Sequence, residues 1–375
     1  MKGYYIHFNA TSEPGVKRKI EFQIRELSKI SLVREINISP RYKSFIIKLL
    51  RRIPFIYPCL YKYNNALNEI VAPDYVYIRR TYADKYYYNF IKYLKKNYPM
   101  CRIIIEIPTY PYIKDDFIHI KNWTLGLKEL FYINFFNRYV DRFVTYSEHN
   151  IIYKVPSISI MNGVDTTLFT KKKVSQENDV LAMIAVATFR RHHGYERIIK
   201  GLYDYKNSSG TRKIKLYLVG NGPELSYYKD LTKEYSLDDY IVFCGAKTGK
   251  ELDILYDKAD IGLGSFGFYK IGLTNASSLK TREYLCKGLP VVSGCLQDIF
   301  IKYPCDYHYE FSNDDSVVDI KAVIAFYDNL YNGELDYGGA KLKLIEDIRL
   351  YANKYVSMES TFSPVLSYIK ESVKE

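Results

Sequence analysis

The stretch LAMIAVATFRRHHGYERIIKGLYDY, residues 181–205, decides how the second half of the chain folds. Residues 181–188 are apolar and rich in β-forming side chains, whereas residues 194–205 carry apolar side chains at helical spacing. The alternation continues, with strands predicted at 213–220, 241–245, 260–266 and 289–294 and helices at 223–235, 250–259 and 277–288. Short apolar strands that alternate with helices form a parallel sheet covered on both faces, so we predict a doubly wound α/β domain.

The first half of the chain has a less regular version of the same pattern. Residues 16–30 are predicted as a helix, because Ile20, Ile24 and Leu27 fall on one face. Strands are predicted at 3–9, 74–80, 102–108, 142–148 and 157–163. These elements predict a second doubly wound domain, so the fold class is α/β with two Rossmann-like domains facing across a cleft.

The length of 375 residues is enough for two domains. We expect a first domain over 1–168 and a second over 172–350, because the polar stretch 163–175 between them has the composition of a linker. Residues 356–370 are predicted as a final helix.

Composition excludes several classes of protein. The 47% hydrophobic and 26% charged residues are ordinary for a globular chain. The six cysteines form no Cys-x-x-Cys pair, which excludes a zinc ribbon and a disulfide scaffold. No apolar run reaches the roughly 18 residues needed to cross a bilayer. The N-terminus lacks the apolar core of a signal peptide, so we expect a cytoplasmic protein.

The excess positive charge is confined to the first half. Residues 1–170 contain 26 Lys and Arg against 14 Asp and Glu, and the rest of the chain contains 28 of each. Residues 41–63 mix Lys48, Arg51 and Arg52 with apolar side chains, as at the surface of an anionic membrane. We therefore expect peripheral binding to the inner face of a membrane; the alternative is a cationic helix that covers the core. No nucleic-acid-binding module is recognisable, so no nucleic-acid partner is expected.

Candidate phosphate-binding residues follow two predicted strands of the second half. Ser277 and Ser278 are N-cap candidates for a helix whose N-terminus would attract a diphosphate. Lys280 could neutralise that diphosphate, and Glu283, one turn later, could accept hydrogen bonds from ribose hydroxyls. An exposed, salt-bridged first turn is the alternative.

Arg190 and Arg191 follow an earlier strand, and guanidinium groups bind phosphate bidentately. A solvated loop is the alternative for this pair. The neighbouring His192 and His193 have no third ligand nearby in sequence, and no Asp-x-Asp occurs, so no metal site is predicted. The stretch GNGPE at 220–224 is an incomplete dinucleotide fingerprint, which argues against an NAD-dependent dehydrogenase.

The stretch EIPTYPY, residues 106–112, is the strongest candidate site in the basic half. A carboxylate at a strand end before two prolines predicts a rigid arrangement that faces the cleft. Glu106 could accept a proton from an acceptor hydroxyl, with Thr109 and Tyr110 beside it. The alternative is a strand-end carboxylate paired with a nearby basic residue.

Several motifs together resemble the retaining nucleotide-sugar glycosyltransferases of family 4, which have the GT-B fold. REYLCKGLPVV (282–292) is similar to the family's E-x-M-A-x-G-x-P-V-V stretch. Further similar segments occur in the family's order, over roughly residues 12–295: EPGVKRKIEFQIREL (13–27), RFVTYSE (142–148), MNGVDTTLF (161–169), LYLVGNGPE (216–224) and ILYDKADIGLGSF (254–266). The resemblance implies that residues 355–375 pack back on the first domain.

The chain also departs from the family pattern. The family's first glutamate is replaced by Asn275, and Glu283 matches its second. Thr188 and His193 stand where the family has Arg and Lys, and Pro108 stands near the place of a histidine seen in many relatives. The donor-binding residues expected from the residues and the resemblance together are Gly15, Arg190, Arg191, His193, Asn275, Ser277, Ser278, Leu279, Lys280 and Glu283.

The expected function is transfer of a sugar from a nucleotide-sugar, with a UDP-sugar as the expected donor, to an acceptor hydroxyl of a lipid-linked or polysaccharide precursor. The resemblance implies retention of configuration and no metal. The expected catalytic residues are Glu106, Lys280 and Glu283. Two alternatives remain: a catalytically weak glycosyltransferase-like partner subunit, and a basic nucleic-acid-binding protein.

Overall fold

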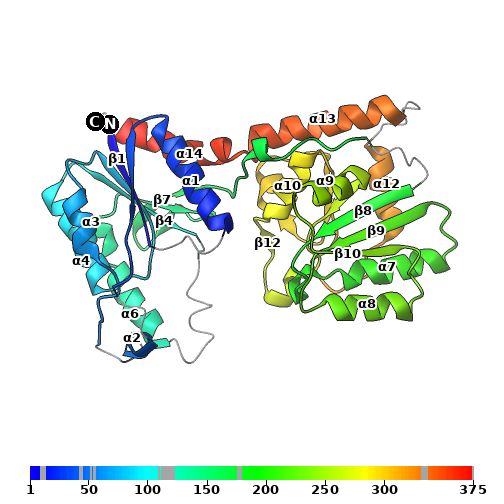
Figure 1. The fold of residues 1–375 in the computed structure, drawn as a ribbon, viewed down its shortest axis with the longest axis horizontal. Coiled ribbons are helices and arrows are strands. Elements are labelled where there is room, and N and C mark those ends of the chain that lie inside the picture. The colour runs from blue at the N-terminus through cyan, green and yellow to red at the C-terminus, as the bar shows by residue number, and fades with distance from the viewer. Residues whose placement is uncertain are drawn as a thin grey trace. The chain divides into compact units, whose positions relative to one another are not determined.

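The structure is a computed structural model in which two compact units are resolved (Figure 1). It describes residues 1–8, 14–41, 45–50, 53, 56–108, 110, 123–174, 180–330 and 337–373. The first unit comprises Met1–Met161 and Thr361–Glu375, and the second comprises Asn162–Ser360. The chain therefore passes from one unit to the other twice.

The first unit is built on a seven-stranded sheet in the order β2-β1-β3-β4-β5-β7-β6. Its strands are β1 (Lys2–His7), β2 (Leu32–Asn37), β3 (Tyr75–Arg79), β4 (Arg102–Ile107), β5 (Arg142–Thr145), β6 (Ile151–Ile152) and β7 (Val155–Ser159). Neighbouring strands are parallel except β6 and β7, which are antiparallel. The order β2-β1-β3-β4-β5 is that of flavodoxin-like sheets, in which ligands bind between the first and third strands.

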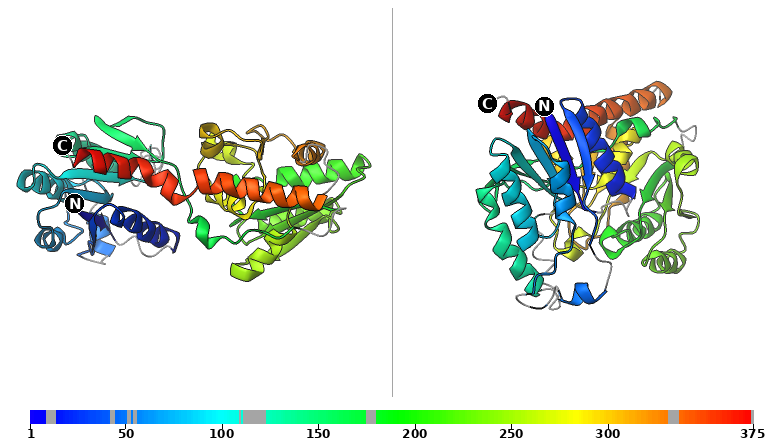
Figure 2. Two further views of the ribbon diagram at one scale, coloured as in Figure 1. Left: turned by 90° about the horizontal axis from the view of Figure 1, so that it is seen from above. Right: turned by 60° about the vertical axis from the view of Figure 1, so that its left-hand side comes forward.

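Helices cover both faces of this sheet (Figures 1 and 2). The α1 (Pro14–Ser28) and α14 (Met358–Ser372) helices cover one face, and α3 (Tyr63–Glu69) and α4 (Lys85–Asn97) cover the other. The remaining helical elements are α2 (Phe45–Leu50), α6 (Trp123–Ile133) and the short η3 (Phe136–Arg138).

Alternation along the strands separates two cores. In β4, Ile103 and Ile105 pack toward α3 and α4, whereas Ile104 packs toward α1 and α14. Glu106 is in step with Ile104, so its carboxylate lies on the α1 side of the sheet.

The second unit contains a six-stranded parallel sheet in the order β10-β9-β8-β11-β13-β15. The strands are β8 (Val180–Val186), β9 (Lys213–Val219), β10 (Ile241–Gly245), β11 (Ile261–Leu263), β13 (Val291–Ser293) and β15 (His308–Glu310). Counted from β8, this is the 3-2-1-4-5-6 order of dinucleotide-binding domains, whose ligand site lies at the carboxyl ends of the first and fourth strands. A separate pair is formed by β12 (Asn275–Ala276) and β14 (Leu296–Gln297).

The helices of this unit follow its strands along the chain. They are α7 (Glu196–Asn207), α8 (Leu225–Glu234), α9 (Gly249–Lys258), α10 (Leu279–Lys287), α11 (Asp298–Lys302), α12 (Ile320–Asn329) and α13 (Tyr337–Tyr355). Three short helical turns join them: η4 (Thr166–Leu168), η5 (Arg191–His193) and η6 (Phe268–Ile271). The prediction of two doubly wound α/β domains is confirmed.

The division of the chain differs from the expected boundary at 168. Residues 162–168 belong to the second unit, because they are hydrogen-bonded to it. The Val164 N–H donates to the Val356 carbonyl at 3.0 Å, and the Met358 N–H donates to the Val164 carbonyl at 3.0 Å. Residues 163–174 of the expected linker therefore belong to the second unit, and the last segment assigned to the first unit begins at 361.

The last helix contributes to the core of the first unit. Phe362 is 3% exposed and meets the Tyr77 ring edge-on, with the ring centroids 5.8 Å apart. Val365 and Ile369 are fully buried in the same cluster as Ile20 and Leu27 of α1.

We predict that Phe362→Ala lowers the free energy of unfolding of the first unit by about 3–5 kcal/mol, the usual cost of removing a buried aromatic ring. Urea unfolding followed by circular dichroism measures the change. The exposed Ser367 of the same helix provides the control, and Ser367→Ala should change stability by less than about 0.5 kcal/mol. Equal stability of the two variants would show that α14 does not complete this core.

Candidate donor site

Two glycine-containing loops meet at the carboxyl ends of β8 and β11. Gly194, in the first loop, has a φ of +65°, and a Cβ there would lie 2.5 Å from the backbone nitrogen of Gly267 in the second. The Phe266 N–H donates to the His193 carbonyl at 2.7 Å. Only glycine allows this approach, so the two loops form one wall at the expected ligand end of the sheet.

Lys280 lies in the first turn of α10 and reaches this wall. Its ammonium donates to the Tyr195 hydroxyl at 3.2 Å and to the Ser265 Oγ at 3.1 Å. It has no ion pair within the described part of the chain, and burial alone lowers its pKa to about 7. The protonated form of the predicted phosphate-binding lysine therefore has no counter-ion in the described ranges, at the ligand end of the sheet.

His193 and the predicted arginines occupy the neighbouring loop. Burial, followed by the charge of Lys280, lowers the pKa of His193 to about 2, so its imidazole is neutral. The Arg190 N–H donates to its Nδ1 at 3.0 Å, which assigns the ring proton to Nε2 and makes that nitrogen a donor. The side chains of Arg190 and Arg191 are exposed. The structure thus brings Lys280, His193 and Arg190 into one electropositive group.

The other predicted donor residues surround the start of α10. Ser278 is the N-cap residue, as predicted, but its side chain makes no capping hydrogen bond. Asn275 and Leu279 are exposed, and Glu283 is half-buried. The charge of Glu283 acts on the neighbouring Tyr256 and Tyr284 phenols rather than on Lys280.

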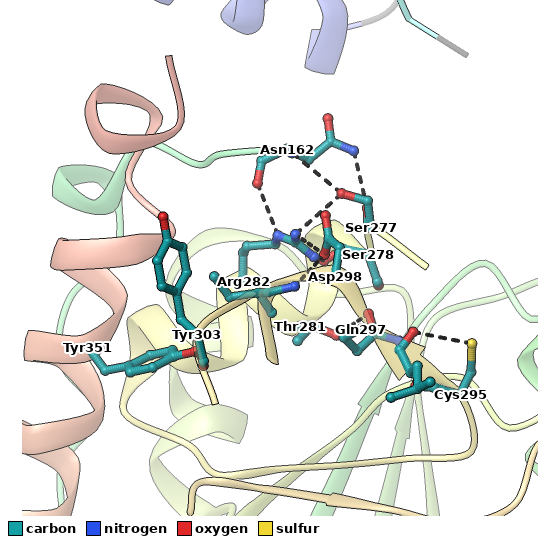
Figure 3. A network of polar contacts seen from close by, with 12 residues as sticks. Asn162, Ser277, Ser278, Thr281, Arg282, Cys295, Gln297, Asp298, Tyr303 and Tyr351 are labelled. Carbon is teal, nitrogen blue, oxygen red and sulfur yellow. Dashed lines mark hydrogen bonds and ion pairs between the residues drawn. The ribbon is translucent and has the colours of Figure 1, made fainter. Parts of the chain in front are cut away.

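A buried guanidinium fixes the beginning of α10 (Figure 3). Arg282 is fully buried, and it donates to the Ser278 carbonyl at 3.0 Å and to the Ser277 Oγ at 3.3 Å. The same side chain forms an ion pair with Asp298. Figure 3 shows these groups converging on the arginine from α10, the 277–278 turn and α11.

The Asn-Gly-Val-Asp stretch at 162–165 belongs to the same network. The Asn162 carbonyl accepts from Arg282 Nε at 3.0 Å, and the Asn162 side-chain amide donates to the Ser277 carbonyl at 3.2 Å. Asp165 accepts from the Thr167 N–H at 3.1 Å and so caps η4. The motif therefore positions the turn in front of α10.

In the first unit, Glu106 is enclosed by hydrogen-bond donors. Its carboxylate accepts from the Tyr77 hydroxyl at 2.8 Å, from Gln23 at 3.0 Å and from the Tyr146 hydroxyl at 3.0 Å. It also accepts from Arg79 at 3.1 Å. Burial acts to raise the pKa of this carboxyl, but the Lys19 and Arg79 charges and the hydrogen bonds outweigh it and lower the pKa.

The prediction that Glu106 faces a cleft is wrong, because its side chain is 0% exposed. Its position agrees with the alternative of a carboxylate paired with basic residues. Tyr110 is half-buried and packs edge-on against His149, with centroids 4.9 Å apart. Thr109 lies outside the described residues, as does the loop before Gly15, which is the second residue of α1.

Several positioning residues were not predicted. Tyr195 and Ser265 hold Lys280, and Arg282 holds its helix. Arg197, 2% exposed, donates to the Phe266 carbonyl at 2.7 Å and fixes the loop that carries Ser265. Arg197 and Arg282 each lie in a helix, where the sequence alone predicts a solvent-exposed charge. Their positioning role becomes visible only when the structure shows which backbone carbonyls they bind.

No group of three or more His, Cys, Asp or Glu that could hold a metal ion occurs in the described part of the chain. In the same ranges, no helix has both the length and the apolar character needed to cross a membrane.

The part of the chain that contains this site is similar to known proteins. Residues 166–301 match the family described as "Glycosyl transferases group 1". This range includes Lys280 and the two loops that contain Gly194 and Gly267. The chain is also 28% identical over 131 residues to WcaL of Salmonella typhimurium, which is named as a colanic acid biosynthesis glycosyltransferase. That match covers 35% of this chain and 32% of WcaL, so the chain spans about a third of the length of this curated relative.

Solved structures extend the likeness of the fold to the whole chain. The lipopolysaccharide outer core galactosyltransferase WaaB has a TM-score of 0.61 at 12% identity, with 99% of each chain covered. Alr3699/HepE of Anabaena, solved in complex with UDP, has a TM-score of 0.61 at 12% identity, over 99% of this chain and 100% of that one. The GT-B fold expected from the sequence is confirmed.

The buried carboxylate of Glu106 should stabilise the first unit in a pH-dependent way. Glu106→Gln should lower the free energy of unfolding at neutral pH by about 3–5 kcal/mol, because it leaves the half-buried Lys19 and Arg79 without their buried counter-charge. Because the folded-state pKa of Glu106 is lowered, its stabilising effect is present above the ordinary carboxyl pKa and disappears as the pH falls through the lowered value.

Denaturant unfolding of both proteins at a series of pH values from neutral to acid tests this. The gap between wild type and Glu106→Gln should narrow toward acid pH, whereas the exposed Glu148→Gln should track the wild type throughout. A gap that is constant with pH would mean that the charge of Glu106 does not stabilise the first unit.

Proposed function

We propose that the protein is a glycosyltransferase that moves a sugar from a nucleotide-sugar to an acceptor hydroxyl. The observation that carries the proposal is the Lys280 ammonium, which has no ion pair in the described part of the chain and lies at the ligand end of a 3-2-1-4-5-6 sheet. A diphosphate bound there would supply the missing negative charge. The group 1 family match over 166–301 supports the same chemistry.

The chemistry asked of the protein is stabilisation of the leaving diphosphate. As the glycosidic bond to the donor breaks, negative charge develops on the phosphate oxygens. Lys280, the Nε2–H of His193 and the backbone N–H groups at the start of α10 are donors of the kind that stabilises this charge. Arg190 and Arg191 are exposed and can close on the phosphates once they bind.

We further propose UDP as the nucleotide, retention of configuration and independence from metal, following the resemblance of the motifs. HepE, a neighbour in fold, was solved with UDP. Names such as colanic acid biosynthesis and lipopolysaccharide outer core, borne by WcaL and WaaB, favour a polysaccharide or lipid-linked acceptor for this chain. Asn275, exposed beside α10, is proposed to orient the donor sugar through its amide.

A peripheral membrane site is proposed on the first unit, defined by Ile53, Ile56, Leu127 and Phe131 and named the α6 patch. Their side chains are 43%, 40%, 49% and 58% exposed. Lys128 of α6 donates to the carbonyls of Ile53 at 2.6 Å and Ile56 at 2.7 Å, which attaches these two residues to the helix. Apolar side chains exposed on a basic unit suit the interface of an anionic bilayer. The side chains of Lys48, Arg51 and Arg52 lie outside the described residues.

The donor site is tested by calorimetric titration of UDP and of uridine. Lys280→Ala should weaken UDP binding by roughly 10- to 150-fold, the value of a hydrogen bond to a charged group, and should change uridine binding much less. Glu283→Gln should weaken both ligands, because the ribose is common to them. The exposed Lys250→Ala serves as the control and should bind UDP as the wild type does.

The pH dependence of UDP binding provides a second test of the donor site. Because the pKa of Lys280 is about 7 without ligand, the side chain is largely neutral at pH 8, and a bound diphosphate should return its proton. UDP binding at pH 8 should therefore take up protons and weaken as the pH rises above 7. Lys280→Arg should bind without proton uptake. Unchanged UDP binding by Lys280→Ala would remove the proposed donor site.

Membrane binding is tested by flotation with vesicles of phosphatidylcholine and phosphatidylglycerol. The double variant Leu127→Glu, Phe131→Glu should lose flotation, because each buried apolar side chain contributes about 1.5–3 kcal/mol. Leu350→Glu, at a 66% exposed position of the second unit, is the matched control. Flotation that is equal for both variants would contradict a membrane role for the α6 patch.

A further inference from the structure

Arg79 is the last residue of β3, at the carboxyl edge of the first unit's sheet, and it alternates onto the same face as Tyr75 and Tyr77. Its strand lies beside β1, and in sheets of this order ligands bind at the carboxyl ends of these two strands. The register places Arg79 opposite Glu106 of β4, so the guanidinium and the buried carboxylate are cross-strand neighbours. Arg79 therefore lies at the expected ligand end of the first unit.

The guanidinium of Arg79 uses only part of its hydrogen-bonding capacity within the described part of the chain. Nη1 donates to Glu106 at 3.1 Å, whereas Nε and Nη2 make no hydrogen bond to a described residue. The side chain is 12% exposed, and neither of these two nitrogens is fully buried. Nε and Nη2 carry parallel N–H groups along one edge of the guanidinium, and such an edge binds the two oxygens of a carboxylate or phosphate.

The Glu106 carboxylate holds this guanidinium in a fixed orientation. Glu106 is fully buried, and it also accepts from the Tyr77 hydroxyl at 2.8 Å and from the Tyr146 hydroxyl at 3.0 Å. A side chain that is oriented before the ligand arrives loses little conformational entropy when it binds. The free edge of Arg79 is therefore preorganised for a ligand.

The charges around this edge favour an anion. Lys19 and Arg79 lie 3.9 Å and 3.1 Å from the carboxylate oxygens of Glu106, so two cations share one carboxylate. Glu35, a further carboxylate beside β1, hydrogen-bonds with His7 at 2.8 Å and makes no ion pair with Arg79 in the described ranges. A net positive charge beside two free donors attracts an oxyanion more strongly than a neutral ligand.

We propose that the Nε–Nη2 edge of Arg79 binds the acidic group, a carboxylate or a phosphate, of the sugar acceptor. The assignment of this anion to the acceptor rests on the proposed glycosyltransferase function, in which Lys280 of the second unit binds the donor diphosphate. Arg79 thus selects acidic acceptors over neutral ones and takes no part in bond breaking.

The free edge is observed directly in the full wild-type chain labelled with nitrogen-15 arginine. Glucose 6-phosphate or galacturonate should shift the Nε–H resonance of Arg79, and the probe that does so identifies the acidic group as phosphate or carboxylate. Neutral glucose should leave this resonance in place. The resonance is assigned by its loss in Arg79→Lys. Arg34, an exposed arginine paired with Glu69, provides the control resonance, which none of the three sugars should shift.

Calorimetric titration with the same sugars measures the contribution of the free edge. Arg79→Lys keeps a positive charge beside Glu106 but lacks the two-donor edge. It should weaken binding of the acidic sugar by roughly 10- to 150-fold, the value of a hydrogen bond to a charged group. Arg34→Lys is the matched control and should bind as the wild type does. Both changes are also made in the Lys280→Ala chain, so that phosphate bound at Lys280 is not counted.

Three results would each overturn the proposal: wild-type affinity in a folded Arg79→Lys, a shift of the Arg79 resonance by neutral glucose, or no response to either acidic sugar. Circular dichroism shows that each variant is folded, and the resonance of the wild type needs no variant to fold. UDP affinity should be unchanged in Arg79→Lys. A wild-type chain that binds UDP but no acidic sugar would contradict this inference alone, and the reverse result would contradict only the donor site.

Discussion

The buried guanidinium of Arg282 is the constraint on which the second unit's ligand end depends. A fully buried cation is stable only where acceptors surround it, and those acceptors come from Asn162, the 277–278 turn and Asp298. Satisfying one charge therefore fixes the entry of the chain into the unit, the beginning of α10 and the position of α11. Lys280 lies two residues before Arg282, so its ammonium inherits that fixed position against Tyr195 and Ser265.

Glu106 and Lys280 differ in whether the protein itself supplies a counter-charge. Glu106 is surrounded by Lys19, Arg79 and three neutral donors, so its charge is compensated within the first unit. Lys280 has two hydroxyl acceptors and no ion pair in the described ranges, so its charge calls for an external anion. Both residues stand near the carboxyl ends of parallel strands, and position alone did not distinguish the structural group from the binding group.

The sequence predicted the fold well where burial leaves a periodic signal. The β8 strand is buried on both faces and forms a continuous apolar run in the sequence. Five of the six strands of its sheet were predicted, and the short, half-exposed β15 was missed. The edge strand β2 was missed because only Ile36 of its six residues is buried. The α4 helix was also missed, although its buried Tyr87, Phe90, Ile91 and Leu94 have helical spacing.

The candidate site was harder to predict because its contacts join residues that are far apart in sequence. Lys280 and Ser278 could be found from the local pattern of a helix start. The enclosure of Glu106 could not, because Gln23 and Tyr146 reach it from elements that lie 83 and 40 residues away. The role of Arg282 could not be predicted either, because its acceptor Asn162 lies 120 residues away in the sequence.

The two passages of the chain between the units affect how the protein can fold during synthesis. The core of the first unit includes Phe362, Val365 and Ile369, which leave the ribosome after the whole of 162–360 has been made. Domains usually complete their folding in the order of synthesis. In this protein, synthesis of the second unit is complete before that of the first. Until residues 361–375 are made, part of the core of the first unit is uncovered. The nascent chain therefore leaves the part of this sheet face that α14 covers exposed throughout translation of the second unit, a period in which a chaperone can bind.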